Sequence, residues 1–157
     1  MKPNLGLNDN ARKASADALA GVLADTYSLY LKTQNFHWNV TGPNFVQLHQ
    51  MFQDQYTELA AAVDEVAERI RALGHFAPGG YAAFAKLTEI KDAPANPPPA
   101  KDMIRQLATD HETIARRARE AETATDEVGD KESADIMIAR MQAHGKTAWM
   151  LRAQLES

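Results

Sequence analysis

The sequence contains no cysteine among its 157 residues, which excludes disulfide bonds, thiolate metal sites and cysteine nucleophiles. Long apolar runs are also missing, since no segment approaches the length needed to span a membrane. The first ten residues, MKPNLGLNDN, lack the apolar core of a signal peptide. We therefore expect a soluble cytoplasmic protein without a membrane partner, and association with the nucleoid is left open.

A basic surplus is absent as well. The formal net charge is −4, and the first fifteen residues carry only Lys2, Arg12 and Lys13 against Asp9. The last residues, RAQLES, form no basic tail. Proteins that bind nucleic acid tightly concentrate lysine and arginine on at least one element. DNA is thus a partner that we expect to be bound weakly.

Strand-like alternation of apolar and polar residues is missing, whereas four long segments show helical periodicity. They run from about Asn8 to Val40, from Phe45 to Leu73, from about Ala100 to Thr123 and from about Asp130 to Leu155. The second segment is the clearest, because its apolar residues recur at steps of three or four until Gly74. Asn8 or Asp9 can cap the first helix, and Gly42-Pro43 ends it.

The connection between the second and third helices is long and contains clusters of proline and glycine, with a possible short helix at YAAFAKL. No internal repeat or second domain is visible. We predict one domain over residues 1–157, with residues 1–8 preceding the first helix. Four amphipathic helices with one long crossover predict an all-α, ferritin-like four-helix bundle with a short extra helix in the crossover.

The Glu-x-x-His pairs of an ordinary di-iron centre inside such a bundle do not occur in this sequence. Two histidines instead flank a Thr-Gly-Pro turn in NFHWNVTGPNFVQLHQMF, at His37 and His49. On a helical wheel with His49 at zero, Asp64 falls near 60° and Glu68 near 100°. One imidazole and two carboxylates therefore share a band along the margin of the predicted core.

The spacing along the helix separates these side chains. His49 and Asp64 lie fifteen residues apart, about 22 Å at a rise of 1.5 Å per residue. Asp64 and Glu68 can share a metal ion, but neither can share it with a histidine of the same straight helix. A two-fold related copy would bring its histidines to these acids and would create two equivalent sites.

The ligand types, two imidazoles and two carboxylates, suit Fe(II), Mn(II) or Zn(II). The alternative interpretation is that a histidine and two acids beside an apolar stripe form a solvated helix edge. The helical wheel alone leaves both interpretations open.

Three motifs decide between them. NFHWNVTGPNFVQLHQMF, the later DEVAERIRALG and the C-terminal HGKTAWMLRA together resemble the Dps family of mini-ferritins. The similarity covers nearly the whole chain and includes APGGYAAFAKLTEIKDA in the crossover. It implies a hollow homododecamer with 23 symmetry that oxidises Fe(II), preferentially with hydrogen peroxide, and stores ferric iron.

The resemblance also assigns the site. It implies that His37 and His49 of one subunit bind iron together with Asp64 and Glu68 of its two-fold partner, with Trp38 beside the centre. Zn²⁺ or Mn²⁺ can occupy the same ligands. Many members carry an acid one turn after the second histidine, where this sequence has Gln53, so the second iron position is expected to be weaker. Gly145 also replaces a common glutamate.

The resemblance further suggests that acids in TDEVGDKESAD line iron-entry pores at the three-fold axes. Asp126, Asp130 and Asp135 are the candidates, although Lys131 interrupts them. Asp130 can alternatively cap the fourth helix. His111 and His144 lie on apolar stripes, and we predict that they are hydrogen-bonded core residues rather than ligands.

The sequence thus predicts an enzyme, a ferroxidase that converts Fe²⁺ to Fe³⁺ and protects DNA by consuming iron and peroxide together. The alternative is a nucleoid-binding structural protein with a vestigial metal site. The sequence does not specify the oxidant, the native metal or the mineral capacity.

Overall fold

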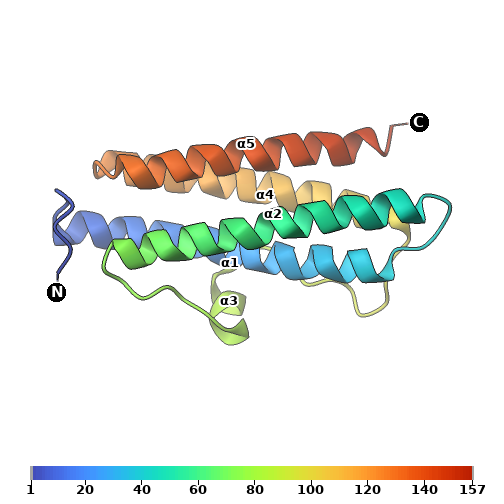
Figure 1. Ribbon diagram of the computed structural model, residues 1–157, viewed down its shortest axis with the longest axis horizontal. Coiled ribbons are helices and arrows are strands. Elements are labelled where there is room, and N and C mark those ends of the chain that lie inside the picture. Colours follow the sequence, from blue (N-terminus) through green and yellow to red (C-terminus); the bar gives the residue numbers. More distant parts are fainter. Residues whose placement is uncertain (1, 157) are drawn as a thin grey trace.

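The computed structural model describes residues 2–156 and contains five helices in this range, with no strand. They are α1 (Asp9–Asn39), α2 (Phe45–Ala72), α3 (Tyr81–Leu87), α4 (Ala100–Glu127) and α5 (Lys131–Ala153). Four of them form an elongated bundle in which α1 and α5 run in one direction and α2 and α4 in the other (Figure 1). The predicted all-α bundle with a short extra helix in the crossover is therefore confirmed.

The helix ends follow local capping chemistry. The side chain of Asn8 accepts a hydrogen bond from the backbone N–H of Ala11 at 2.8 Å, which confirms Asn8 as the cap of α1. Gly74, with φ +91°, follows the last turn of α2 in a conformation that other residues rarely adopt. Helix α4 extends to Glu127, four residues beyond the predicted end, because no glycine or proline stops it earlier.

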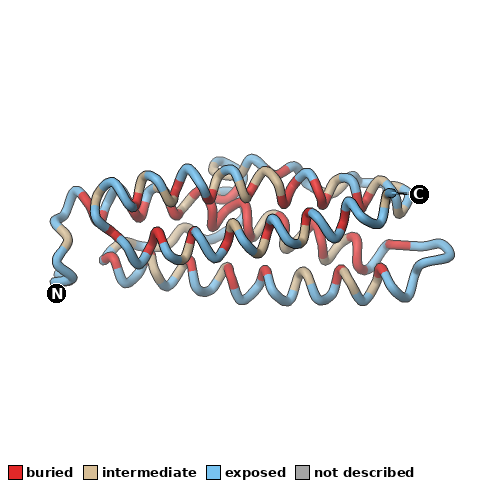
Figure 2. The backbone as a smooth tube through the Cα atoms, turned by 90° about the horizontal axis from the view of Figure 1, so that it is seen from above, coloured by how far each residue is buried: buried red, intermediate tan, exposed pale blue. Residues whose placement is uncertain are grey.

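The core lies between the four long helices, and their inward faces carry the buried residues (Figure 2). Along α2 and its C-terminal cap Leu73, the predicted apolar stripe is buried at six positions and half-buried at two, whereas Phe45 at the helix start is 41% exposed. The six buried positions are Leu48, Phe52, Leu59, Val66, Ile70 and Leu73. Helices α4 and α5 pack closely together, as do α1 and α2, while α2 and α5 meet only sparsely.

The long crossover traverses the whole length of the bundle and carries α3 against α1 (Figure 1). Its anchor is Asp25, a buried carboxylate that accepts hydrogen bonds from the Thr88 hydroxyl at 2.9 Å and the Glu89 backbone N–H at 2.7 Å. Arg117 of α4 reaches the same carboxylate at 3.1 Å. Burial raises the pKa of Asp25, although these partners oppose the shift.

Candidate metal centre

The turn between α1 and α2 brings the two predicted histidines together. Gly42, with φ +110°, reverses the chain, and its carbonyl accepts a hydrogen bond from the backbone N–H of Phe45 at 3.1 Å. His37 lies in the last turn of α1 and His49 in the second turn of α2. Their rings stack with centroids 3.7 Å apart and an angle of 18° between the planes.

Each imidazole is held by the backbone of the other residue. The Nδ1 of His37 donates to the carbonyl of His49 at 2.7 Å, and the Nδ1 of His49 donates to the carbonyl of His37 at 2.8 Å. A carbonyl can only accept, so both Nδ1 atoms carry the proton. In the neutral rings both Nε2 atoms are then free to act as ligands, which is the arrangement that metal-binding histidines commonly show.

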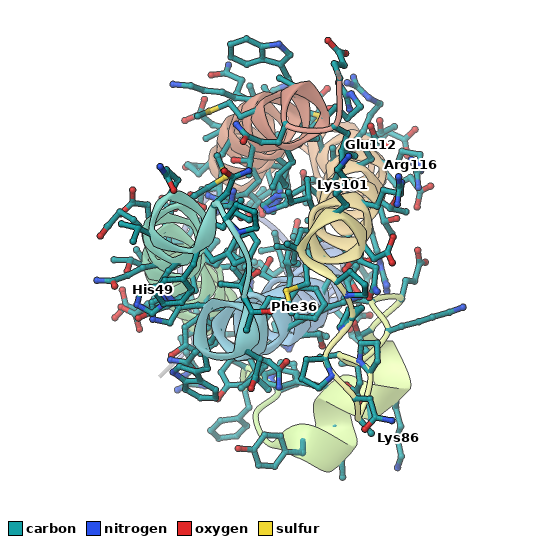
Figure 3. The ribbon with its side chains drawn as sticks, turned by 90° about the vertical axis from the view of Figure 1, so that its right-hand side faces the viewer. Phe36, His49, Lys86, Lys101, Glu112 and Arg116 are labelled. Atoms are coloured by element: carbon teal, nitrogen blue, oxygen red, sulfur yellow. The ribbon has the colours of Figure 1, made fainter. Side chains whose placement is uncertain are left out.

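The histidine pair lies at the margin of the bundle. Figure 3 looks onto this end and places His49 on the outer side of α2, whereas Phe36 of α1 points into the interior and is fully buried. His37 is 7% exposed and His49 is half-buried. The ring of Tyr56, two turns after His49, meets the His37 ring edge-on at a centroid distance of 5.2 Å.

The two predicted acids lie elsewhere on α2. Asp64 and Glu68 are exposed, one turn apart, and line a shallow depression of about 460 Å³ together with Glu58, Glu65 and Arg140. Arg140 is committed to Glu58, since its Nη2 reaches the carboxylate at 3.1 Å. Within residues 2–156, no ion pair involves Asp64 or Glu68. Their carboxylates are therefore available to a ligand from outside the chain.

One chain thus provides two half-sites. Across the described part of the chain, no group of three or more His, Asp or Glu side chains is arranged to hold a metal ion. The structure stacks His37 on His49 and places Asp64 and Glu68 in one depression, but His49 and Asp64 lie fifteen positions apart on one straight helix, which keeps the two pairs separate. The donor set fits a divalent metal only if another copy supplies the missing half.

The neighbouring positions differ in what they can contribute. Gln53 is exposed one turn after His49, so its neutral amide can approach a metal held there but adds no charge. Trp38 is 63% exposed, so within one chain it covers little of the histidine pair. Gly145 lies within α5 with open space around its Cα.

The three pore candidates cluster at the turn between α4 and α5. Asp130 is fully buried, caps α5 by accepting from the Ser133 backbone N–H at 3.1 Å, and pairs with Arg69 at 2.5 Å. Burial alone would raise its pKa, but the hydrogen bonds from Ser133 and Arg69 leave the pKa lowered. Asp126 is exposed and pairs with Lys131, and Asp135 is exposed. This geometry favours the capping role for Asp130.

His111 and His144 are buried and hydrogen-bonded to each other, which confirms their predicted place in the core. Their Nδ1 atoms lie 2.8 Å apart, and Arg140 approaches Nε2 of His144 at 3.2 Å. Because Arg140 can only donate, His144 carries its proton on Nδ1 and donates it to His111. Burial lowers the pKa of His111 to about 3 and that of His144 well below its usual value, with Arg140 adding to both shifts.

The sequence analysis missed the contacts that surround the histidine pair. Tyr56 belongs to the apolar stripe of the second predicted helix, and its spacing of seven residues from His49 places both side chains on one helix face, which could have indicated the contact. The hydrogen bonds from each histidine to the backbone carbonyl of the other cannot be predicted from the sequence, because they depend on the geometry of the turn. The pairing of Arg140 with Glu58 joins residues that lie 82 positions apart.

Comparison with known proteins places these features in context. A ferritin-like domain profile matches residues 16–157. An uncharacterized low-temperature-induced protein of Nostoc sp. is 37% identical over 98% of this chain and 86% of its own length. The DNA protection during starvation protein of Brevibacillus brevis is 35% identical over 92% of this chain and 99% of its own.

Solved structures agree with this similarity. The Dps protein of Vibrio cholerae, described as a member of a broad superfamily of ferritin-like diiron-carboxylate proteins, superposes with a TM-score of 0.92 at 28% identity. The match covers 99% of this chain and 98% of that one.

Proposed function

Because the chain belongs to the Dps family of ferritin-like proteins, we propose that it oxidises Fe(II) at a centre shared by two subunits and stores the ferric product in a homododecameric shell. The proposal names the ligands His37 and His49 from one subunit and Asp64 and Glu68 from its partner. Iron is the substrate and the cargo. Zn²⁺ and Mn²⁺ are competing occupants of the same donor set.

The observation that carries this proposal is the state of the histidine pair. Two stacked imidazoles both have their Nδ1 protons fixed by backbone carbonyls, so in the neutral form of each ring the free lone pair lies on Nε2. A pair of histidines that served only for packing would not need both rings held in the same tautomer. The unpaired Asp64 and Glu68 supply the negative charge that two neutral imidazoles lack.

The chemistry follows from this donor set. Carboxylates and neutral imidazoles bind Fe(II), and two carboxylates stabilise the additional charge of Fe(III). Hydrogen peroxide accepts two electrons and two protons to give two molecules of water, so two ferrous ions can supply its electrons. When both electrons reach the same peroxide molecule, no hydroxyl radical is released, and DNA is protected without any contact with the shell.

The supporting features extend beyond the centre. Relatives of this chain carry the name DNA protection during starvation protein, which matches a role in removing iron and peroxide. Asp126 and Asp135 at the turn between α4 and α5 are exposed acids that can guide cations, and we propose them as pore residues. Asp130, which is buried, would instead shape this turn.

Anaerobic titration with Fe(II), followed by addition of peroxide, tests the proposal. We expect saturable Fe(II) binding, rapid formation of ferric absorbance and a particle of about 208 kDa, twelve times the 17.3 kDa chain. A stable monomer, or oxidation no faster than in protein-free buffer, would contradict it. Repeating the titration after loading with Zn²⁺ separates specific oxidation from adsorption, because Zn²⁺ should block only the centre.

A further inference from the structure

A chain of aromatic rings leads away from the histidine pair between α1 and α2. Tyr56 meets the His37 ring edge-on at 5.2 Å, and Tyr30 meets Tyr56 edge-on at 5.9 Å. Tyr27 follows Tyr30 at 5.7 Å, and Phe84 of α3 lies 4.9 Å from Tyr27. Each distance joins two ring centroids and lies in the range at which neighbouring aromatic rings interact. Three phenols thus form a continuous path that begins at a proposed iron ligand.

Packing accounts for the rings but not for their hydroxyl groups. All three tyrosines are half-buried, at the joint between α1 and α2. A phenylalanine would fill the same space without the cost of partly desolvating a phenol. The only protein hydrogen bond found for these hydroxyls among residues 2–156 is a long one from Gln34 to Tyr30, at 3.4 Å. The phenols share one chemical property that phenylalanine lacks, which is the ability to give up one electron and one proton.

The proposed centre needs an electron donor of this kind when it holds a single ferrous ion. One Fe(II) supplies one electron, whereas peroxide requires two for complete reduction to water. The side chain one turn after His49 is the neutral Gln53, so this position adds no negative charge to that of the proposed ligands Asp64 and Glu68 for retaining a second ferrous ion. A centre that holds a single ferrous ion would reduce peroxide by one electron and release a hydroxyl radical, unless another group delivers the second electron.

We infer that Tyr56 is this electron donor, acting through His37 when the centre holds one ferrous ion. Fe²⁺, H₂O₂, one proton and the Tyr56 phenol then give Fe³⁺, a Tyr56 phenoxyl radical and two water molecules. The phenol loses one electron and its hydroxyl proton, and both O–O electrons end in water. Tyr30 and Tyr27 extend the path and move the unpaired electron away from the iron.

A later ferrous ion closes the cycle. It gives one electron to the phenoxyl radical, which takes up a proton and returns to tyrosine while the ion becomes Fe³⁺. The two steps together consume two ferrous ions and one peroxide. The tyrosines thus store one oxidising equivalent from the oxidation of the first ferrous ion until the second one binds. This inference rests on the proposed ferroxidase function and adds the residue that allows iron to be oxidised one ion at a time.

The experiment adds one Fe(II) per subunit to the assembled protein without oxygen, then adds peroxide and freezes the sample within milliseconds to seconds. Electron paramagnetic resonance detects a protein radical, absorbance follows ferric iron, and a spin trap reports escaping hydroxyl radical. The variant is Tyr56→Phe, which retains the ring against His37. The matched control is Tyr81→Phe, because Tyr81 is a tyrosine that is 75% exposed on α3 and lies outside the ring chain.

We expect a tyrosyl signal in the unmodified protein and in Tyr81→Phe. In Tyr56→Phe the signal should be lost or several-fold smaller, and the spin-trap adduct several-fold larger. Ferric iron without any protein radical in the unmodified protein would overturn the inference while leaving the ferroxidase function intact. The same holds if Tyr56→Phe gives an unchanged signal, or if the radical has the spectrum of tryptophan at Trp38. If no iron is oxidised in any sample, the proposed function itself fails and the inference falls with it.

Discussion

At the scale of single residues, the most informative groups are the histidines, because the same side chain has opposite environments at two places. His37 and His49 lie at the edge of the bundle, and each Nδ1 donates a hydrogen bond to the backbone carbonyl of the other residue. His111 and His144 are buried, and Arg140 lies against His144, so a proton added there would meet a positive charge. Position relative to the core, rather than residue type, separates the proposed ligands from the buried pair.

The buried pair predicts how stability depends on pH. Its pKa values are lower in the folded chain than the ordinary 6.5, so below pH 6.5 the unfolded chain binds more protons than the folded one. The free energy of unfolding should therefore fall as pH decreases from 6.5 toward about 3, the pKa of His111, by at most about 1.4 kcal/mol per pH unit for each histidine. Urea denaturation between pH 5 and 7 measures this slope.

The control for this prediction is His75→Gln, since His75 lies outside the core. The double variant His111→Gln with His144→Gln should flatten the slope over the same pH range, although it also lowers overall stability. An equal slope in the double variant and the unmodified protein would show that other groups cause the pH dependence.

At the scale of elements, α2 shows how far the sequence predicts the site. Its apolar stripe, its start at Phe45 and its end before Gly74 follow from periodicity and from glycine chemistry, and the structure agrees. The angular positions of Asp64 and Glu68 follow from the same helix geometry. The orientation of the two imidazoles does not, because it depends on backbone carbonyls that the turn brings close. The expectation of a shell rests on the resemblance to the Dps family, because no pattern within a single chain indicates how many copies assemble.

The turn between α4 and α5 carries an element-scale prediction. Asp130→Ala removes the cap of α5 and leaves Arg69, whose side chain is 13% exposed, without its carboxylate partner at 2.5 Å. We expect a loss of about 3 kcal/mol in the free energy of unfolding, because α5 loses its cap and Arg69 keeps only the more distant, exposed carboxylate of Glu132 at 3.7 Å. Urea denaturation of the isolated subunits measures the loss.

Asp126→Ala is the matched control at this turn, since Asp126 is exposed and its ion pair within residues 2–156 is with the exposed Lys131. Its effect should remain within about 0.5 kcal/mol. If Asp130→Ala were as mild as Asp126→Ala, the cap and the ion pair would not hold the turn together.

At the scale of the whole molecule, charge governs contact with DNA. In the proposed shell, twelve copies at −4 would carry a formal charge of −48. The basic residues near the N-terminus are already engaged, since Lys2 and Arg12 pair with Asp9, and Lys13 pairs with Asp17. Arg12 is buried and also donates to the carbonyl of Leu73 at 3.0 Å.

No described helix is both long enough and apolar enough to cross a membrane.

We therefore predict weak or undetectable binding to duplex DNA at about 150 mM salt, where counterion release is small and screening is strong. A gel-shift assay with plasmid DNA decides this, with a salt series to show that any binding at low ionic strength disappears steeply. Condensation of DNA by the shell at this salt concentration, without bridging divalent metal, would favour a nucleoid-binding structural protein over a ferroxidase.

The central claim is that each centre takes its histidines from one subunit and its acids from another. Shells of His49→Ala alone and of Glu68→Ala alone should each oxidise Fe(II) slowly, because every centre lacks one ligand. After the two variants are dissociated and reassembled together, a mixed two-fold interface contains one centre with all four ligands. Stopped-flow absorbance should then show rapid oxidation restored to about a quarter of the unmodified rate, which follows from random pairing at a two-fold interface. Verified mixed shells that remain as slow as their parents would contradict the account.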